Sequence, residues 1–371
     1  MGSHTAARRV VVLNAGTATL KVAIFELRSA ELVETHRAEH AWLEQEDGSR
    51  LVRAALDEIE RPIAAIGHRV VHGGDAFTAT VRIDSAVEEG IRELVALAPL
   101  HNARALEAIR GARLRLPEVP SFAVFDTAFH AERPRASLFY ALPQEITRAL
   151  KLRRYGFHGI AHAALVESLA GAEDRGLRDV TAVTLQLGSG CSACAVRAGR
   201  SIETSMGYTP LEGLVMQTRC GNIDPAIVLQ MLRAGHAVDE IDAQLNRRSG
   251  LLALSGCKDM RAILAAEAQG DDGARLAIEV FVHRIVLTVG AYFTLLEGRG
   301  ALVFGGGIGT HSPEIRARVA ASLRAWDVHL DPRLNTPNAL GRISMSGARA
   351  VYVFRTNEEH LIARELARLL S

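Results

Sequence analysis

The stretch VVVLNAGTATLKVAIF, residues 10–25, contains two apolar, β-rich runs joined by a short turn of small and hydroxyl-bearing residues. A plain hairpin needs only a pair such as Asn-Gly or Asp-Gly. Here the turn contains Asn14, Gly16, Thr17 and Thr19, and Lys21 follows it. This excess of polar groups leaves two interpretations open: a strand-edge turn with a solvated lysine, or a loop that binds an anion.

A second segment of the same design lies about half a chain later. Residues 182–200, AVTLQLGSGCSACAVRAGR, again form a β run, a turn of glycine and serine, and another β run. Repetition on this scale indicates two related halves. Because backbone N–H groups and hydroxyls in such turns can cradle a phosphate, the pair favours phosphate-binding loops.

The composition excludes several classes of partner. The chain has 371 residues, of which 48% are hydrophobic, so it can bury large cores. A net charge of +1 and an aromatic content of 5% argue against nucleic acid or an anionic membrane as the main partner. The longest apolar stretch, residues 281–296, includes His283 and Arg284 and is short for a bilayer, so we expect a buried helix and no membrane segment.

Cysteine content and the first residues bear on the compartment. The chain contains four cysteines, and its start lacks the apolar core and cleavage pattern of a signal peptide. Few cysteines in a long chain are typical of a reducing compartment. We therefore expect a cytoplasmic protein.

Apolar periodicity predicts an α/β protein. Strands are expected at 10–14, 20–27, 64–71, 80–83, 121–125, 181–187, 192–197 and 301–304, and helices at 86–98, 102–113, 224–234, 274–297 and 312–325. Ser85 and Glu88 fit a capping box at the start of the first of these helices. Strands followed by helices in both halves predict two layered domains with a ligand cleft between them.

Several segments place reactive side chains at the ends of expected strands. Arg69 precedes a Gly-Gly turn, where its guanidinium can bind a carboxylate or phosphate through two parallel hydrogen bonds, or form a surface salt bridge. Asp126 follows another β run, a position typical of catalytic or metal-binding carboxylates in open α/β sheets, with a turn cap as the alternative. His101 follows a helix that ends at a proline.

Three further segments carry candidate binding groups. In RYGFHGIAH, residues 154–162, the missing glutamate and an internal glycine argue against a zinc helix and favour one histidine that donates to a phosphoryl oxygen. The nearly uncharged segment 205–225 supplies one cation, Arg219, which needs an anionic partner if it is buried. Residues 304–316 read as strand, glycine-rich turn and helix, whose N-terminus suits a nucleotide, although the Walker lysine is missing.

In sequence order, these motifs resemble those of the acetate kinases, the acetokinase branch of the superfamily that includes sugar kinases, Hsp70 and actin. The resemblance covers Val10 to about Ala367 and rests on NAGTATLK, GHRVVHGG, LAPLHN, FDTAFH, YGFHG, TSMGYTPLEGLVMQTRCGNIDPA, SGLL, DMR, FGGGIG and TNEEHLIA. It implies an α/β fold of two related domains of the actin-like, ribonuclease H-like type with an active-site cleft between them. It also implies a homodimer that transfers phosphate reversibly from ATP to acetate, giving acetyl phosphate and ADP, with Mg²⁺ or, in its place, Mn²⁺.

The resemblance assigns roles to individual residues. It implies that Asp126, His158 and Arg219 are catalytic, and that Asn14 and Glu358 hold the metal. Substrate binding falls to Arg69, Val71, Leu100, His101, Phe157 and Pro210, of which Val71, Leu100, Phe157 and Pro210 form the pocket for the methyl group. Nucleotide binding falls to Thr17, Thr19, Lys21, Gln186, Leu187, Gly188, Ser189, Gly190, Asp259, Met260, Arg261, Gly307, Ile308, Gly309, Thr310 and His311.

The C-terminal segment RTNEEHLIARELARLL, residues 355–370, poses a choice between two glutamates. Thr356 is a natural N-cap with Glu359 as its capping-box partner, which leaves Glu358 for another role. The resemblance implies that Glu358 is the Mg²⁺ residue and that the last helix folds back onto the first domain. The expected domains are therefore 1–127 with 358–371, and 128–357.

Two motifs depart from the usual family pattern. The second loop reads QLGSG where HLGNG is usual, and the later turn reads GGIGTH where GGIGEN is usual. The acetate side is unchanged, so pyrophosphate or phosphate as the donor stays an alternative to ATP, as does propionate as the preferred acid. A non-enzymatic, actin-like nucleotide protein is the alternative from another class, but it would not need Arg69, His158 and Arg219. The chain is also short for the family between Phe25 and Gly67.

Overall fold

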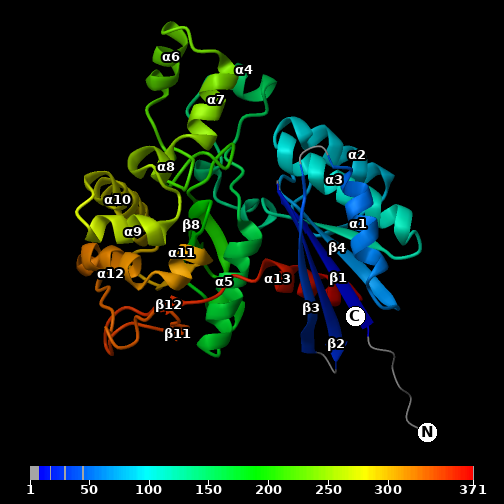
Figure 1. Ribbon diagram of the computed structural model, residues 1–371. Coiled ribbons are helices and arrows are strands. Elements are labelled where there is room, and N and C mark those ends of the chain that lie inside the picture. Colours follow the sequence, from blue (N-terminus) through cyan, green and yellow to red (C-terminus); the bar gives the residue numbers. More distant parts are fainter. Residues whose placement is uncertain (1–7, 17, 29–30, 44–45, 371) are drawn as a thin grey trace. The chain divides into compact units, whose positions relative to one another are not determined.

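The computed structural model describes residues 8–16, 18–28, 31–43 and 46–370 (Figure 1). The chain divides into two compact units. Unit 1 comprises Met1–Ala131, Gly159–Ala163 and Asn357–Ser371, and unit 2 comprises Glu132–His158 and Ala164–Thr356. Of the predicted site residues, Thr17 lies outside the described residues.

Unit 1 is built on a six-stranded sheet with the order β3-β2-β1-β4-β6-β5. The middle strands β1, β4 and β6 are parallel, whereas β2, β3 and β5 pair antiparallel with their neighbours. The strands are β1 (Arg8–Ala15), β2 (Thr19–Arg28), β3 (Glu31–Ala41), β4 (Ile63–Val70), β5 (Val81–Arg82) and β6 (Ser121–Phe125).

Helices cover both faces of this sheet. One face packs on α1 (Gly48–Asp57) and α3 (Pro99–Arg115) through a core that includes Leu13, Leu56 and Ala112. The other face packs on α13 (Glu358–Leu370), where a Cβ at Gly67 would lie 2.6 Å from Ile362. Figure 1 shows the red C-terminal helix α13 against the blue strands of the N-terminal segment. Helix α13 therefore packs on the N-terminal strands of the same unit.

Unit 2 repeats the same strand pattern. Its six-stranded sheet has the order β11-β12-β10-β7-β8-β9, with β7, β10 and β12 parallel and the other neighbours antiparallel. The β1–β2 and β7–β8 turns therefore occupy equivalent places in the two sheets, which confirms the two related halves expected from the repeated segment. The strands are β7 (Ala182–Leu187), β8 (Cys191–Arg197), β9 (Arg200–Thr204), β10 (Ala301–Gly305), β11 (Gly341–Arg342) and β12 (Val351–Val353).

The long apolar helix α10 (Asp272–Leu295) is central to unit 2, since Phe281, Ile285 and Phe293 on one of its faces are fully buried. Within the described part of the chain it is the one helix whose length and composition would allow it to cross a membrane. The other α-helices that lie wholly or partly in unit 2 are α4 (Gln144–Ala149), α5 (Gly159–Ala172), α6 (Pro225–Arg233), α7 (Val238–Arg247), α8 (Gly250–Ser255), α9 (Met260–Ala268), α11 (Gly306–His311) and α12 (Pro313–Ser322).

The strands and helices predicted from periodicity are confirmed, with shifts at their ends. The first predicted helix continues beyond α2 (Ser85–Glu93) as a short 3-10 turn, Leu94–Ala96. Its capping box is wrong, because the N-cap is Asp84, whose carboxylate accepts a hydrogen bond from the Val87 amide. Other 3-10 turns are Ala128–His130, Arg135–Ser137, Leu177–Asp179 and Arg324–Trp326.

Candidate active site

Arg69 lies at the centre of a buried polar cluster in unit 1. Its Nε and Nη2 donate to the two carboxylate oxygens of Asp126, at 3.2 and 2.5 Å, and its Nη1 donates to Oδ1 of Asn14 at 3.2 Å. The strands β1, β4 and β6 bring these residues together because the carboxyl ends of parallel strands meet at one edge of a sheet. The bidentate contact that we expected Arg69 to make with a ligand carboxylate is therefore made with Asp126, a carboxylate of the protein itself.

The first turn of α13 adds two carboxylates to the same cluster. Nδ2 of Asn14 donates to Glu359 at 2.7 Å and to Glu358 at 3.4 Å, and Nε of Arg69 lies 3.5 Å from Glu358. Arg37 on β3 donates to the second oxygen of Glu359 at 3.0 Å. A continuous chain of polar contacts thus runs from β3 through α13 and β1 to β4.

The predicted capping box of this helix is wrong. The helix begins at Glu358, and the Oδ1 atom of Asn357 accepts a hydrogen bond from the His360 amide at 3.0 Å, which makes Asn357 the cap. Asn357 competes successfully with Thr356 because an asparagine is as good an N-cap and lies one residue closer to the helix. Glu359 is consequently free to bind Asn14 and Arg37.

Burial and the neighbouring charges shift the pKa values of Arg69 and Glu358 in this cluster. Burial lowers the pKa of Arg69, but Asp126 and Glu358 outweigh that effect and the net direction is upward. Burial raises the pKa of Glu358 above its usual 4.5; Asp126 and Glu359 add to the rise, while Arg69 opposes it. Carboxylate and amide oxygens of this kind suit a hard cation. Among the described residues no group of three His, Cys, Asp or Glu could by itself hold a metal, so a cation here would need phosphate or water oxygens as well.

His158 and Arg219 form the corresponding cluster in unit 2, around the turn after β7. A Cβ at Gly190 would lie 3.1 Å from Cε1 of His158 and 3.5 Å from Nη1 of Arg219, so a side chain here would crowd the imidazole and touch the guanidinium. Nδ1 of His158 lies 2.9 Å from the hydroxyl of Ser192 on β8. Both side chains therefore border the predicted phosphate-binding turn.

Arg219 differs from Arg69 in its partners. Nη1 of Arg219 donates to the carbonyl oxygen of Pro210 at 3.3 Å and approaches the sulfur of Met216 at 3.6 Å. No carboxylate of the described residues forms an ion pair with it, and burial lowers the pKa of Arg219 from its usual range. An arginine in this state has free donors for an anionic ligand.

The remaining predicted nucleotide residues of unit 2 differ in exposure. The turn after Leu187 is closed by a hydrogen bond from the Gly188 amide to the Gly190 carbonyl, and the Ser189 carbonyl accepts one from Gln217. Asp259 is the N-cap of α9 and pairs with the exposed Arg261. Met260, Ile308, Gly309 and Thr310 are buried, whereas His311 is exposed and Gly307 has open space around it. Thr310 donates to the Phe354 carbonyl at 3.4 Å.

The predicted methyl-pocket residues are divided between the units. Val71 is 5% exposed and Leu100 53% exposed in unit 1, and Phe157 is fully buried in unit 2 together with the half-buried Pro210. His101 is half-buried on α3. In the first turn, the Thr19 carbonyl accepts a hydrogen bond from Gly16, and Lys21 is close enough for its charge to act on Glu358.

The sequence did not predict two side-chain contacts of the candidate site, that of Ser192 with His158 and that of Arg37 with Glu359. Ser192 lies directly opposite Gln186 in the β7–β8 ladder and so projects from the same face of the sheet, a signal that strand alternation contains. No local pattern identifies Arg37, because its partner Glu359 is more than 300 residues away.

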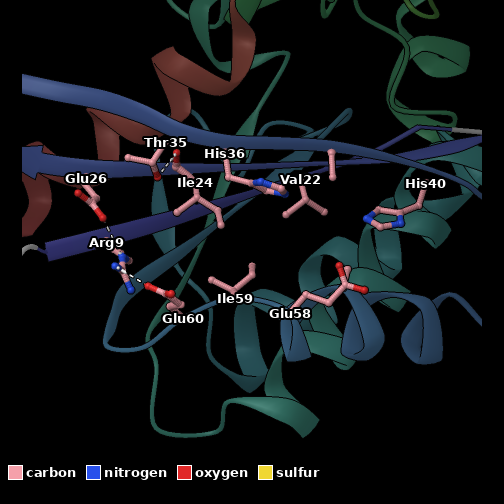
Figure 2. A pocket seen from close by; sticks show the side chains of 12 residues that line it. Arg9, Val22, Ile24, Glu26, Thr35, His36, His40, Glu58, Ile59 and Glu60 are labelled. Carbon is pink, nitrogen blue, oxygen red and sulfur yellow. Dashed lines mark hydrogen bonds and ion pairs between the residues drawn. The ribbon is translucent and has the colours of Figure 1, made fainter.

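A cavity of about 330 Å³ lies between the β1–β3 strands and the end of α1 in unit 1. Figure 2 shows Val22 and Ile24 among the residues that line it, together with Arg9 bound to Glu26 and Glu60. None of the predicted site residues that the structure describes lines it.

Comparison with known proteins agrees with the geometry. The model of the acetokinase family matches residues 46–364. An acetate kinase of Chloroherpeton thalassium is 42% identical over 357 residues, which covers 92% of this chain and 84% of that protein. The solved structure of a propionate kinase from Francisella tularensis has a TM-score of 0.89 at 36% identity, covering 96% of this chain and 98% of that one. Porphyromonas gingivalis acetate kinase has a TM-score of 0.90 at 29% identity, covering 98% of this chain and all of the other.

The matches extend over most of the sequence and over both units. They include relatives whose sequence identity to this chain is well above the level at which two proteins share only a fold. The two related α/β domains are accordingly those of an actin-like kinase. The chain belongs to the acetokinase family.

Proposed function

We propose that the protein transfers the terminal phosphoryl group of ATP directly and reversibly to acetate, giving acetyl phosphate and ADP. The observation that supports this most is Arg219: a half-buried guanidinium that has no carboxylate partner in the described part of the chain and lies beside His158 and the glycine turn. In-line phosphoryl transfer requires cations around the equatorial oxygens more than covalent chemistry. Arg219 and His158 supply donors of that kind.

Arg69 and Asp126 have a different part in the reaction. A carboxylate nucleophile is already ionised at neutral pH, so Asp126 has no essential proton to remove. Asp126 holds Arg69, which keeps one unused N–H on each Nη atom after its contacts with Asp126 and Asn14. Those two donors suffice to orient the acetate carboxylate beside the moving phosphoryl group.

Mg²⁺ fits the oxygen-rich side of this cluster, where Asn14 and Glu358 would hold it. The rise in the pKa of Glu358 reflects burial and an excess of negative charge, which a hard cation relieves. Bound there, Mg²⁺ would neutralise negative charge that develops on the phosphoryl group during transfer.

The remaining assignments are proposed on the family resemblance. Thr17, Thr19 and Lys21 would contact phosphates, Gln186 to Gly190 the donor, and Asp259 to Arg261 with Gly307 to His311 the adenosine. Val71, Leu100, Phe157 and Pro210 would bound the methyl group, and His101 would lie beside it. The functional domains would be 1–127 with 358–371, and 128–357.

Formation of acetyl phosphate, trapped as its hydroxamate, tests the proposal. With purified protein, acetate and Mg²⁺, we expect product with ATP and none with inorganic phosphate. Because Ser189, Thr310 and His311 depart from the usual donor motifs, GTP and pyrophosphate are tested in parallel. Product from pyrophosphate but not from ATP would keep the acyl acceptor and replace the donor; no product from any of these donors would overturn the function.

We also propose a cytoplasmic homodimer. All four cysteines are free thiols, which suits a reducing compartment. Helix α6 has no buried residue although it carries Ile227, Leu229 and Leu232, and apolar surface of this kind is usually covered in an assembly.

Sedimentation of the double variant Leu229→Glu, Leu232→Glu tests the dimer surface. The wild type is expected to sediment as a dimer and the variant as a folded monomer. A variant that stays dimeric would place the contact elsewhere, and a monomeric wild type would contradict the dimer.

A further inference from the structure

The hydroxyl of Thr356 lies where three strand ends of unit 2 meet. Its Oγ1 donates to Oε1 of Gln186 at 2.7 Å and accepts a hydrogen bond from the Gly306 amide at 3.1 Å. Gly305 and Gln186 are paired across β10 and β7, and a Cβ at Gly305 would lie 2.8 Å from the Thr356 hydroxyl. The close approach of these strands therefore depends on glycine and leaves space for one hydroxyl.

This contact decides which end of the Gln186 amide is available. The amide oxygen is occupied by the Thr356 hydroxyl, so the two N–H donors of Nε2 form the other end. Within the described part of the chain, Nε2 has no protein acceptor. The side chain is half-buried, so a ligand can still reach it.

The position of Gln186 in the sheet gives those donors a direction. Gln186 is directly opposite Ser192 in the antiparallel β7–β8 ladder, and opposite residues project from the same face. Ser192 holds Nδ1 of His158 on that face. Two hydroxyls thus position two neighbouring groups: Ser192 positions the imidazole of His158, and Thr356 positions the amide of Gln186.

We propose that Thr356 is a positioning residue for the phosphoryl donor, which holds the Gln186 amide so that Nε2 donates to a donor phosphate oxygen. The inference rests on the proposed function. Without the hydroxyl, the amide is free to turn and present its oxygen to the phosphate, which repels an anion instead of binding it. Thr356 acts only through Gln186, so its effect falls on binding of the donor and not on acetate.

Steady-state kinetics of Thr356→Val, with Thr356→Ser as the matched control, tests this positioning role. Loss of one oriented hydrogen bond to a charged group predicts a KM for ATP roughly tenfold higher in Thr356→Val, with the KM for acetate unchanged. Thr356→Ser keeps the hydroxyl and is expected to stay within about twofold of the wild type. In a Gln186→Ala background, Thr356→Val is expected to add nothing further.

Gln186→Glu provides a second test that does not remove the threonine. The glutamate keeps an acceptor for the Thr356 hydroxyl but replaces the N–H donors with an oxygen, so we expect the KM for ATP to rise at least as much as in Thr356→Val.

Three results would overturn the role of Thr356: an unchanged KM for ATP in Thr356→Val or Gln186→Glu, equal losses in the Val and Ser variants, or full additivity with Gln186→Ala. A wild-type protein that forms no acetyl phosphate would instead overturn the proposed function. The two failures are therefore distinguishable in the same assay.

Discussion

Arg69 and Arg219 lie in the two polar clusters of the candidate site, one in each unit, and their charges have opposite surroundings. Asp126 binds Arg69 through two hydrogen bonds, and Glu358 lies beside it. Arg219 has a carbonyl oxygen and a thioether as its nearest partners. An arginine that is paired with carboxylates of the protein stabilises the fold whether or not a ligand is bound. An arginine without such partners keeps its N–H donors available for an anionic ligand.

The surroundings of the two arginines can be compared directly, because the sheets of the two units have the same topology. In unit 1 the ends of the parallel strands β1, β4 and β6 bring Asp126 to Arg69, whose charge it neutralises, and Asn14 accepts a further hydrogen bond from Arg69. In unit 2 the turn after β7 contains glycines, and His158 and Arg219 lie close to the backbone of Gly190. The same sheet topology thus supports a charged cluster that suits a metal in unit 1 and a glycine turn beside two donor side chains in unit 2.

Arg219→Gln is expected to have the largest effect on catalysis. Loss of this cation should lower kcat by roughly 10³-fold or more, since an arginine that stabilises transferring phosphate contributes that much. Far-ultraviolet circular dichroism should be unchanged, because no ion pair with another described residue is lost. Turnover close to that of the wild type would remove Arg219 from the reaction.

The pair Glu358→Gln and Glu359→Gln separates metal binding from structure. Glu358→Gln is expected to raise the Mg²⁺ concentration for half-maximal activity at least tenfold or so, with little change in stability, since it relieves repulsion among carboxylates. Glu359→Gln breaks the contact of α13 with Arg37 and should lower the free energy of unfolding by about 1–3 kcal/mol.

Titration of activity with Mg²⁺ measures the Mg²⁺ requirement of each variant, and urea unfolding measures its stability. If Glu359→Gln shifted the Mg²⁺ requirement more than Glu358→Gln did, the assignment of the two glutamates would be reversed.

Val71→Ala is expected to have the smallest effect. Val71 follows β4 two residues after Arg69, and it is 5% exposed. We expect the wild type to prefer acetate over propionate by roughly tenfold in kcat/KM, because one methylene in an apolar pocket is worth about 1–3 kcal/mol. The alanine variant should narrow that ratio by improving propionate. Equal use of acetate and butyrate by the wild type would show that Val71 does not bound the pocket.

Much of the fold could be predicted because its signals are local. The two β-turn-β segments indicate the repeated halves. Apolar residues that recur with a period of two or of 3.6 residues predict the strands and helices that form the cores. Strand β3 was missed because its sequence, ELVETHRAEHA, has exposed polar residues over most of its length. Helix α13 was expected, but its cap was misplaced because Thr356 and Asn357 both satisfy the local preference.

The candidate site was predictable only in part. Motifs in sequence order indicate which residues belong to it, since each motif is local. Partners are not local: Arg69 and Asp126 are 57 residues apart, and Asn14 and Glu359 are 345 residues apart. Which arginine is neutralised by the protein follows only from the strand order that brings β4 beside β6.

Urea unfolding of ligand-free wild type, Arg69→Gln and Arg219→Gln, measured side by side, tests the difference between the two arginines most directly. Arg69→Gln leaves Asp126 and Glu358 buried without their cation, so its free energy of unfolding should fall by about 3–5 kcal/mol. Arg219→Gln removes a half-buried charge that has no carboxylate partner among the described residues, and it should leave the free energy of unfolding unchanged or raise it. A large loss of stability in Arg219→Gln with none in Arg69→Gln would contradict the account.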